Sequence, residues 1–330
     1  MILYNIQHHG DTTWLPWLLQ MLQHPQNRFL VTYDGPLARA DRLARDLAAL
    51  PLEARSLAVE PSLPIRWCGP SQAMMLEDVL RRAVAIPGWD FFINLSGTCA
   101  PLLPQPDIAA HLQNRLRDGI TAHFFSFPVR KPPVLPLDDP EADPVQVERN
   151  RLTLRGNPAL VAQFADPEYL PVRNPANRLY VACREPDDDP GVLEIARPDP
   201  DELAFRTDYL ARVQHHCGRA WFVFHRSACE ALVRLFDQAD FAEAARLFYN
   251  CFEPDESFLQ TLIMNRMAFP LDQVSPDNLR AFKGRPQFLH DDNMDDLKSE
   301  TGAFFARKIN HGKAAALRTM IETRTGRKPV

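Results

Sequence analysis

The amino-acid sequence predicts an α/β protein with a mostly parallel central sheet. Over the first 130 of its 330 residues, short apolar runs typical of buried strands alternate with amphipathic runs typical of helices. Strands that alternate with helices along a chain usually form a parallel sheet with helices on both faces. Ligands of such sheets bind beyond the carboxyl ends of the strands. The turns that follow the strands are therefore where we expect a site.

Each element of this half has a local signal. Strands are expected over Leu3–Gln7, Phe29–Asp34 and Trp89–Gly97, and helices over Thr13–Gln23, Ala38–Leu50 and Ser71–Ala85. Pro16 falls in the first turn of the first helix, where proline is tolerated, and Ser71 is a candidate cap for the third. Asp34-Gly35-Pro36 is a turn signal. The turns at 33–35 and 94–97 are predicted to meet at one edge of the sheet.

The rest of the chain divides into an irregular segment and a second ordered half. Residues 131–203 are rich in Pro and Asp, with short β-like pieces at Arg151–Leu154 and Leu179–Cys183. After residue 203, a strand is expected over Ala220–Phe224 and helices over Arg226–Ala239, Ala242–Phe248, Glu300–Ile309 and Lys313–Thr323. We interpret residues 1–330 as one domain with a first half (1–130), an irregular insert (131–203) and a second half (204–330).

Composition narrows the class of protein. The net charge of −5 argues against a dedicated nucleic-acid binder. Thirty prolines against thirteen glycines predict stiff, irregular connections. The six cysteines are scattered without a CxxC pair, which indicates reduced thiols in a cytosolic protein. Neither a signal peptide nor a membrane-spanning run is expected.

The segment Cys251–Leu262 combines a loop and a helix start. Pro254 closes the loop, and Asp255 is expected to cap a helix by accepting hydrogen bonds from exposed amides. Glu256 then falls in the first helical turn, where the helix dipole favours its charged form. A carboxylate that projects there can serve as a general base. The alternative is that Glu256 only occupies a helix N-terminus and has no catalytic role.

Several common motifs are missing from the sequence. It contains neither GxGxxG nor GxxxxGK[ST], and the GxSxG of serine hydrolases is also absent. The Asp-rich runs do not directly follow a buried strand, and the strand end Asn94–Gly97 lacks a carboxylate pair. We therefore expect no metal site and no cofactor.

Four segments, taken in order, resemble the family of core-2/I-branching β-1,6-N-acetylglucosaminyltransferases and peptide O-xylosyltransferases. They are Arg66–Ser71, Trp89–Gly97 with Pro101-Leu102, Gly218–Phe222 with Pro254-Asp255-Glu256, and Phe304–Lys308. The sequence departs from the family pattern at Cys68, where glycine is usual, at Arg219, where serine is usual, and at Thr98-Cys99-Ala100. The chain looks like a bacterial member of this family.

The resemblance implies a GT-A fold and an inverting, metal-independent glycosyl transfer from a UDP-sugar, with UDP-GlcNAc first and UDP-xylose second. It implies that residues 1–130 bind the nucleotide sugar and that residues 204–330 hold the acceptor and the catalytic groups, with Glu256 as the catalytic base. Lys308 resembles a lysine that binds the diphosphate, with Arg280 or Arg285 as its partner. The residues that resemble nucleotide contacts are Tyr33, Asp34, Gly35 and Phe91. Trp221 and Asp255 are candidates for contacts with the acceptor.

The physical chemistry agrees with this resemblance. A departing diphosphate gains negative charge, which a fixed lysine and arginine can stabilise in place of a metal ion. Since residues 300–309 are predicted to be helical, Arg307 should point about 100° away from Lys308, and Lys308→Ala should lose more activity than Arg307→Ala.

The expected partners are a UDP-sugar and a glycan or lipid-linked saccharide acceptor, without nucleic acid. The expected location is the cytoplasm, with peripheral association at the inner face of the membrane. The alternative is a non-catalytic protein of the same fold that binds a glycan or a nucleotide sugar.

Overall fold

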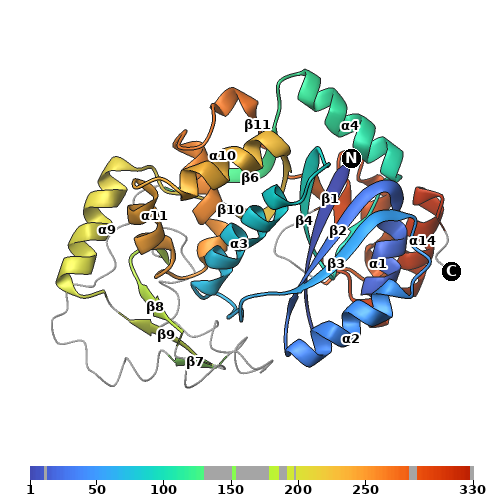
Figure 1. Ribbon diagram of the computed structural model, residues 1–330, viewed down its shortest axis with the longest axis horizontal. Coiled ribbons are helices and arrows are strands. Elements are labelled where there is room, and N and C mark those ends of the chain that lie inside the picture. The colour runs from blue at the N-terminus through green and yellow to red at the C-terminus, as the bar shows by residue number, and fades with distance from the viewer. Residues whose placement is uncertain are drawn as a thin grey trace.

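A central sheet organises the protein (Figure 1). The computed structural model describes residues 1–10, 13–129, 151–153, 178–185, 192–196, 198–281 and 288–327. Within these residues the sheet has the strand order β11-β6-β10-β4-β1-β2-β3. Its strands are β1 (Ile2–His9), β2 (His24–Asp34), β3 (Ala54–Pro61), β4 (Phe91–Ser96), β6 (Ala122–Pro128), β10 (His216–His225) and β11 (Val274–Ser275). Only β10 runs against its neighbours. The predicted α/β class and mostly parallel sheet are confirmed.

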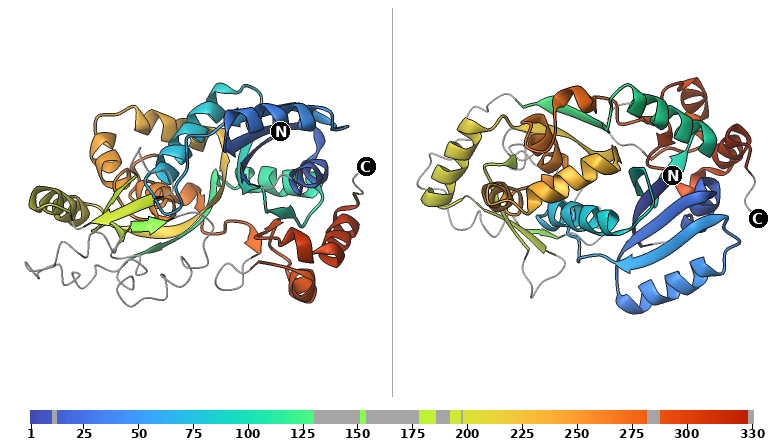
Figure 2. Two further views of the ribbon diagram at one scale, coloured as in Figure 1. Left: turned by 90° about the horizontal axis from the view of Figure 1, so that it is seen from below. Right: turned by 45° about the horizontal axis from the view of Figure 1, so that its top comes forward.

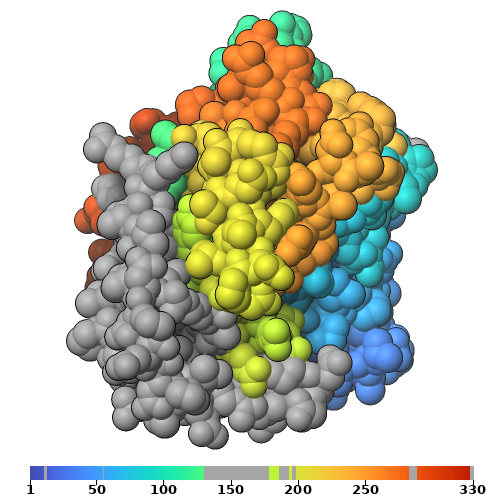
Figure 3. Space-filling view, turned by 90° about the vertical axis from the view of Figure 1, so that its left-hand side faces the viewer, coloured from blue at the N-terminus to red at the C-terminus, as the bar shows by residue number. Residues whose placement is uncertain are grey.

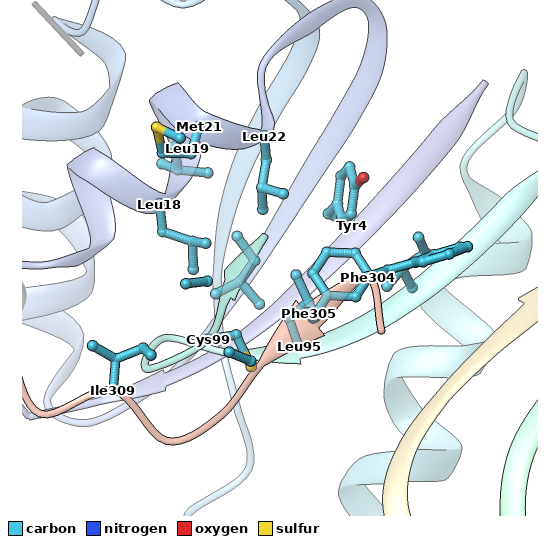
Figure 4. Close-up of a cluster of buried hydrophobic side chains, with 14 of the residues drawn as sticks. Tyr4, Leu18, Leu19, Met21, Leu22, Leu95, Cys99, Phe304, Phe305 and Ile309 are labelled. Carbon is cyan, nitrogen blue, oxygen red and sulfur yellow. The ribbon is translucent and has the colours of Figure 1, made fainter. Parts of the chain in front are cut away.

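Helices cover both faces of this sheet. One face packs against α1 (Leu15–Leu22), α2 (Leu37–Ala48), α4 (Gln105–Arg117) and α14 (Ala315–Thr325). The other packs against α3 (Ser71–Ala85), α10 (Arg226–Phe236), α11 (Phe241–Phe248) and α12 (Phe258–Met264). Alternate residues of β1 serve the two layers, because successive side chains of a strand point to opposite faces. Figure 4 shows Tyr4 and Leu95 in the first layer, with Leu18 and Phe305 beside them.

A second sheet joins the C-terminal part to the end of β4. It contains β12 (Arg280–Ala281), β13 (Phe305–Ala306) and β5 (Ala100–Pro101), in the order β12-β13-β5. The helix predicted over Glu300–Ile309 is wrong, since α13 (Met294–Ser299) ends before it. Residues 303–306 are all buried. Four consecutive buried residues suit a strand between packed layers rather than a helix with one exposed face.

The insert is described in part. Three short strands form an antiparallel sheet in the order β7-β9-β8: β7 (Arg151–Thr153), β8 (Ala182–Arg184) and β9 (Val192–Ala196). Helix α9 (Pro200–Arg212) follows them. It lies on the face of the molecule that Figure 3 shows, within the yellow segment. Ion pairs join α9 to α11, with Arg212 3.0 Å from Glu243 and Arg246 2.8 Å from Glu202.

Figure 2 places α9 at the opposite end of the molecule from the C-terminal helix α14.

Short 3₁₀ turns complete the described elements at Pro254–Glu256, Leu271–Gln273, Asp291–Asn293 and His311–Lys313. In the part of the chain described, no helix combines the length and the apolar character needed to cross a membrane.

Candidate active site

The carboxyl ends of the parallel strands meet at one edge, which we call the carboxyl edge. Gln7 of β1 is in register with Ser96 of β4, and His9 is in register with Asp34 of β2. The predicted meeting of the turns at 33–35 and 94–97 is therefore confirmed. Because β10 runs in the opposite direction, its first half lies at this edge, and the main-chain carbonyl of Ala220 accepts a hydrogen bond from Asn94 at 3.0 Å.

Three acids lie in the turn Glu253–Glu256, which we call the acidic turn. Pro254–Glu256 is a 3₁₀ turn, and α12 begins only at Phe258. The prediction that Asp255 caps this helix is wrong, because the structure has Ser257 at the cap position and no side-chain cap hydrogen bond. The hydroxyl of buried Ser257 lies 3.2 Å from His215 Nε2 and 3.0 Å from Cys217 Sγ. These contacts fasten the end of the acidic turn to β10.

Arginine side chains surround the acidic turn. Arg178 bridges two of its acids, with Nη2 2.5 Å from Glu253 Oε2 and Nη1 2.9 Å from Glu256 Oε2. Arg219 Nη1 lies 3.7 Å from Glu256 Oε1. Glu256 therefore has an arginine near each carboxylate oxygen.

Arg307 lies at the carboxyl edge as well. Its guanidinium carbon is 4.0 Å from the centre of the Trp221 ring, and its Nε donates to Ser96 Oγ at 3.3 Å. An arginine at this distance over an indole face makes a favourable cation–π contact. The contact covers one face of Trp221, which is itself buried, so any acceptor contact through that face would have to displace Arg307.

The position of Arg178 depends on the buried Arg206 of α9. Arg206 Nη1 donates to the carbonyls of Leu179 and Val181, and its Nη2 donates to the carbonyl of Asn250. These bonds tie the residues that follow Arg178 to the loop that precedes the acidic turn. Glu185, at the other end of the same segment, accepts a hydrogen bond from the Ser71 amide at 2.8 Å. That amide belongs to the first turn of α3, where an anion is favoured. Ser71 itself does not cap α3 through its side chain, contrary to the prediction.

Burial and mutual repulsion change the protonation of these acids. Burial, followed by the charges of Glu256 and Glu253, raises the pKa of Asp255 to about 8. Burial also raises the pKa of Glu253, although Arg178 opposes this shift. Burial alone would lower the pKa of Arg178, but Glu253 and Glu256 raise it above its usual value. The arrangement can thus keep one bridged carboxylate beside a neutral carboxylic acid.

The two described candidates for binding the diphosphate differ in burial and in contacts. Arg280 is buried, and its guanidinium donates to the carbonyls of Asn94 at 3.0 Å and Asn278 at 3.3 Å. Burial lowers its pKa to about 10. Lys308 is half-buried, with Nζ 5.6 Å from the centre of the exposed Phe288 ring. Burial, together with nearby Arg307, lowers the pKa of Lys308. Arg285 lies outside the described residues.

The predicted nucleotide contacts also differ in position. Tyr33 is at the carboxyl edge, but its ring is buried between His8 and Gly35. Asp34 accepts a hydrogen bond from the Ile65 amide at 3.3 Å, and burial raises its pKa. The prediction for Phe91 is wrong. Phe91 begins β4 in register with Ile2, so it lies buried at the opposite edge of the sheet.

Among the described residues, no group of three or more His, Cys, Asp and Glu side chains is arranged to hold a metal ion. The expected metal independence remains a prediction.

Comparison with known proteins identifies the N-terminal part of the chain. The family model described as Core-2/I-Branching enzyme matches residues 4–131. Over this segment, the chain is similar to the Core-2/I-branching enzyme family. The matched branching-enzyme segment contains β1 to β6, and so it includes the carboxyl edge but not the acidic turn. The mostly parallel sheet agrees with the GT-A fold expected for this family.

Individual relatives cover less of the chain. Xylosyltransferase 2 of Homo sapiens is 32% identical over 127 residues, which are 37% of this chain and 14% of that protein. Xylosyltransferase 2 of Mus musculus is 31% identical over the same length and with the same coverage. The chain thus matches a small fraction of the length of these relatives.

Solved structures give weak likenesses. Mouse xyloside xylosyltransferase 1 has a TM-score of 0.31 at 10% identity, covering 94% of this chain and 98% of that one. Core-mannan synthase A of Aspergillus fumigatus, in its Mn/GDP form, has a TM-score of 0.29 at 11% identity, covering 81% and 71%. At such scores the likenesses add nothing to the fold assignment, which rests on the sheet itself.

The raised pKa of Asp255 predicts a pH dependence of stability. Between its usual value of 3.8 and about 8, the folded protein keeps a proton that the unfolded chain releases. The unfolded state binds fewer protons in this window, so the free energy of unfolding falls as the pH rises. This contribution is complete below pH 3.8 and is lost as the pH passes about 8. Asp255→Asn should flatten the corresponding part of the profile, as measured by urea unfolding at a series of pH values.

The exposed Asp240 at the start of α11 provides the control. Asp240→Asn should leave the slope of the profile between these pH values as in the wild type. An Asp255→Asn profile parallel to the wild-type profile would show that Asp255 ionises in the folded protein as it does in the unfolded chain.

Proposed function

We propose that this protein is an inverting glycosyltransferase that moves a sugar from a UDP-sugar to a hydroxyl of a glycan or lipid-linked saccharide. The observation that carries the proposal is the position of Glu256 between Arg178 and Arg219, at the carboxyl edge of the sheet. The N-terminal strands of this sheet lie in the segment that matches the branching-enzyme model. Ligands of such sheets bind at this edge. UDP-GlcNAc is the first candidate donor, and UDP-xylose is the second, in keeping with the xylosyltransferase relatives.

Glu256 supplies the base in this reaction. Its carboxylate takes the proton of the acceptor hydroxyl as that oxygen bonds to the anomeric carbon from the side opposite the diphosphate. The bond between the anomeric carbon and the diphosphate oxygen breaks, and UDP leaves with the electron pair. Attack in line with the leaving group inverts the anomeric centre. Glu256 then returns its proton to solvent.

Fixed cations stabilise the departing UDP in this proposal. Lys308 is the lysine, and Arg307 becomes the better candidate for its arginine partner, because Arg307 lies beside Ser96 while Arg280 is buried on carbonyls. A guanidinium can hold two phosphate oxygens at once. We expect no metal ion to be required, and we expect the enzyme to work in the cytoplasm at the inner face of the membrane.

Glu256→Gln tests the base. Glutamine keeps the size of the side chain but cannot take a proton, so turnover should fall by roughly 10²–10⁴. Donor binding, measured by thermal shift across UDP-, GDP- and CMP-sugars, should stay nearly unchanged. A donor at 100 times its Kd should stabilise the protein by about 2.7 kcal/mol.

The matched control is Glu53→Gln, an exposed glutamate just before β3 at the opposite edge of the sheet, which should keep wild-type turnover. A Glu256→Gln enzyme with wild-type turnover would exclude Glu256 as the base. A wild-type protein that binds a UDP-sugar but never releases UDP would favour the non-catalytic alternative.

A chelator and two substitutions test the fixed cations. Activity should survive a strong chelator. Lys308→Ala should lose on the order of 10²–10³ in turnover, as expected on removal of one electrostatic donor to the transition state. Arg307→Ala should lose at least as much, which reverses the order expected from a helix, because residues 305–306 form a strand and Arg307 contacts Ser96 at the carboxyl edge. Lys298→Ala, on the exposed side of α13, serves as the control. Activity that disappears in chelator and returns with manganese or magnesium would contradict the proposal.

A further inference from the structure

Cys68 has an unusual backbone conformation next to the acidic turn. Its φ is +67°, in the left-handed region that glycine adopts without cost and that other residues adopt rarely. The residue is fully buried, three residues before α3 begins. Such a conformation persists only where the surrounding structure compensates for its cost.

The thiol provides that contact. Cys68 Sγ donates to Glu253 Oε1 at 3.3 Å, and the Glu253 amide donates back to the Cys68 carbonyl at 2.8 Å. Burial and the nearby Glu253 raise the pKa of Cys68 well above its usual value, so the thiol keeps the proton that it donates. Gln72 strengthens the junction, since its Oε1 accepts from the Cys68 amide at 2.7 Å.

The contacts continue from Cys68 to Glu256 without interruption. Glu253 meets the thiol with one carboxylate oxygen and Arg178 with the other, at 2.5 Å. The second terminal nitrogen of Arg178 meets Glu256 at 2.9 Å. Each member of the series therefore limits where the next one can lie.

We propose that Cys68, Glu253 and Arg178 form a relay of positioning residues that keeps the Glu256 carboxylate oriented toward the acceptor. The inference rests on the proposed role of Glu256 as the base. The charged and titratable groups that face Glu256 come from four segments, and they are Arg178, Arg219, Cys217, Glu253, Asp255 and Arg307.

The relay works because two acids share one arginine. Arg178 supplies one hydrogen-bond donor to Glu253 and one to Glu256. When the thiol satisfies part of Glu253, Arg178 can divide its donors between the two carboxylates. Without the thiol, Glu253 competes more strongly for Arg178, and Glu256 loses its orientation.

Cys68→Gly separates this role from a merely structural one. Glycine suits the left-handed conformation, so the variant should fold with a Tm equal to or above that of the wild type. Its kcat should fall about two- to tenfold, the range expected for loss of one modest hydrogen bond. The KM for the donor should stay unchanged. Cys68→Ser keeps a donor and should restore kcat.

Arg266→Gly is the matched control. Arg266 is exposed after α12 and also has a positive φ, of 60°, but it lies outside the relay. Its replacement should leave kcat unchanged. Wild-type kcat in Cys68→Gly would overturn the relay while leaving the proposed function intact. A wild-type protein without transferase activity would instead overturn the proposed function, and with it the purpose of the relay.

A double-mutant cycle tests the contacts without any substrate. The unfolding free energies of wild type, Cys68→Gly, Glu253→Gln and the double variant should be non-additive, because each single change removes the same hydrogen bond. Additive effects would overturn the relay whatever reaction the protein catalyses.

Discussion

The candidate site depends on one constraint: three carboxylates within four residues must share a small, largely buried volume. Such a group is unstable alone, because burial and mutual repulsion both oppose ionisation. The protein meets the constraint with Arg178, which bridges Glu253 and Glu256, and with a proton retained on Asp255. Breaking a buried bridge of this kind leaves an uncompensated charge, so the rest of the site is built to keep Arg178 in place.

That support comes from elements far apart in the sequence. Arg206 of α9 holds the carbonyls that follow Arg178, and Glu185 joins the same segment to the first turn of α3. The turn before α3 returns to the acidic turn through Cys68, and Ser257 fastens the other end of the turn to β10. The second hydrophobic layer packs α3, α12 and β10 against one another. The geometry at Glu256 is thus a product of the whole second layer.

The sequence predicted most of the sheet, because apolar periodicity is a local property. Helix α3 was predicted at the bounds observed, Ser71–Ala85, and the carboxyl edge followed from the turn signals after β2 and β4. The helix predicted over Glu300–Ile309 failed, since pairing of Phe305 with Pro101 depends on contacts about two hundred residues apart. Arg178 left no signal at all: it is one arginine in an irregular, Pro-rich insert, and only the tertiary structure brings it to Glu256. Cys68 and Arg219 were visible as departures from the family pattern, although their contacts with Glu253 and Glu256 were not.

The central claim is that Glu256 activates the attacking oxygen directly, in a single displacement. The most direct measurement is proton NMR of the sugar first released when water replaces the acceptor of an α-linked UDP-sugar, recorded before mutarotation. A single displacement by activated water gives the β-anomer first. Initial release of the α-anomer would require retention and would contradict the account.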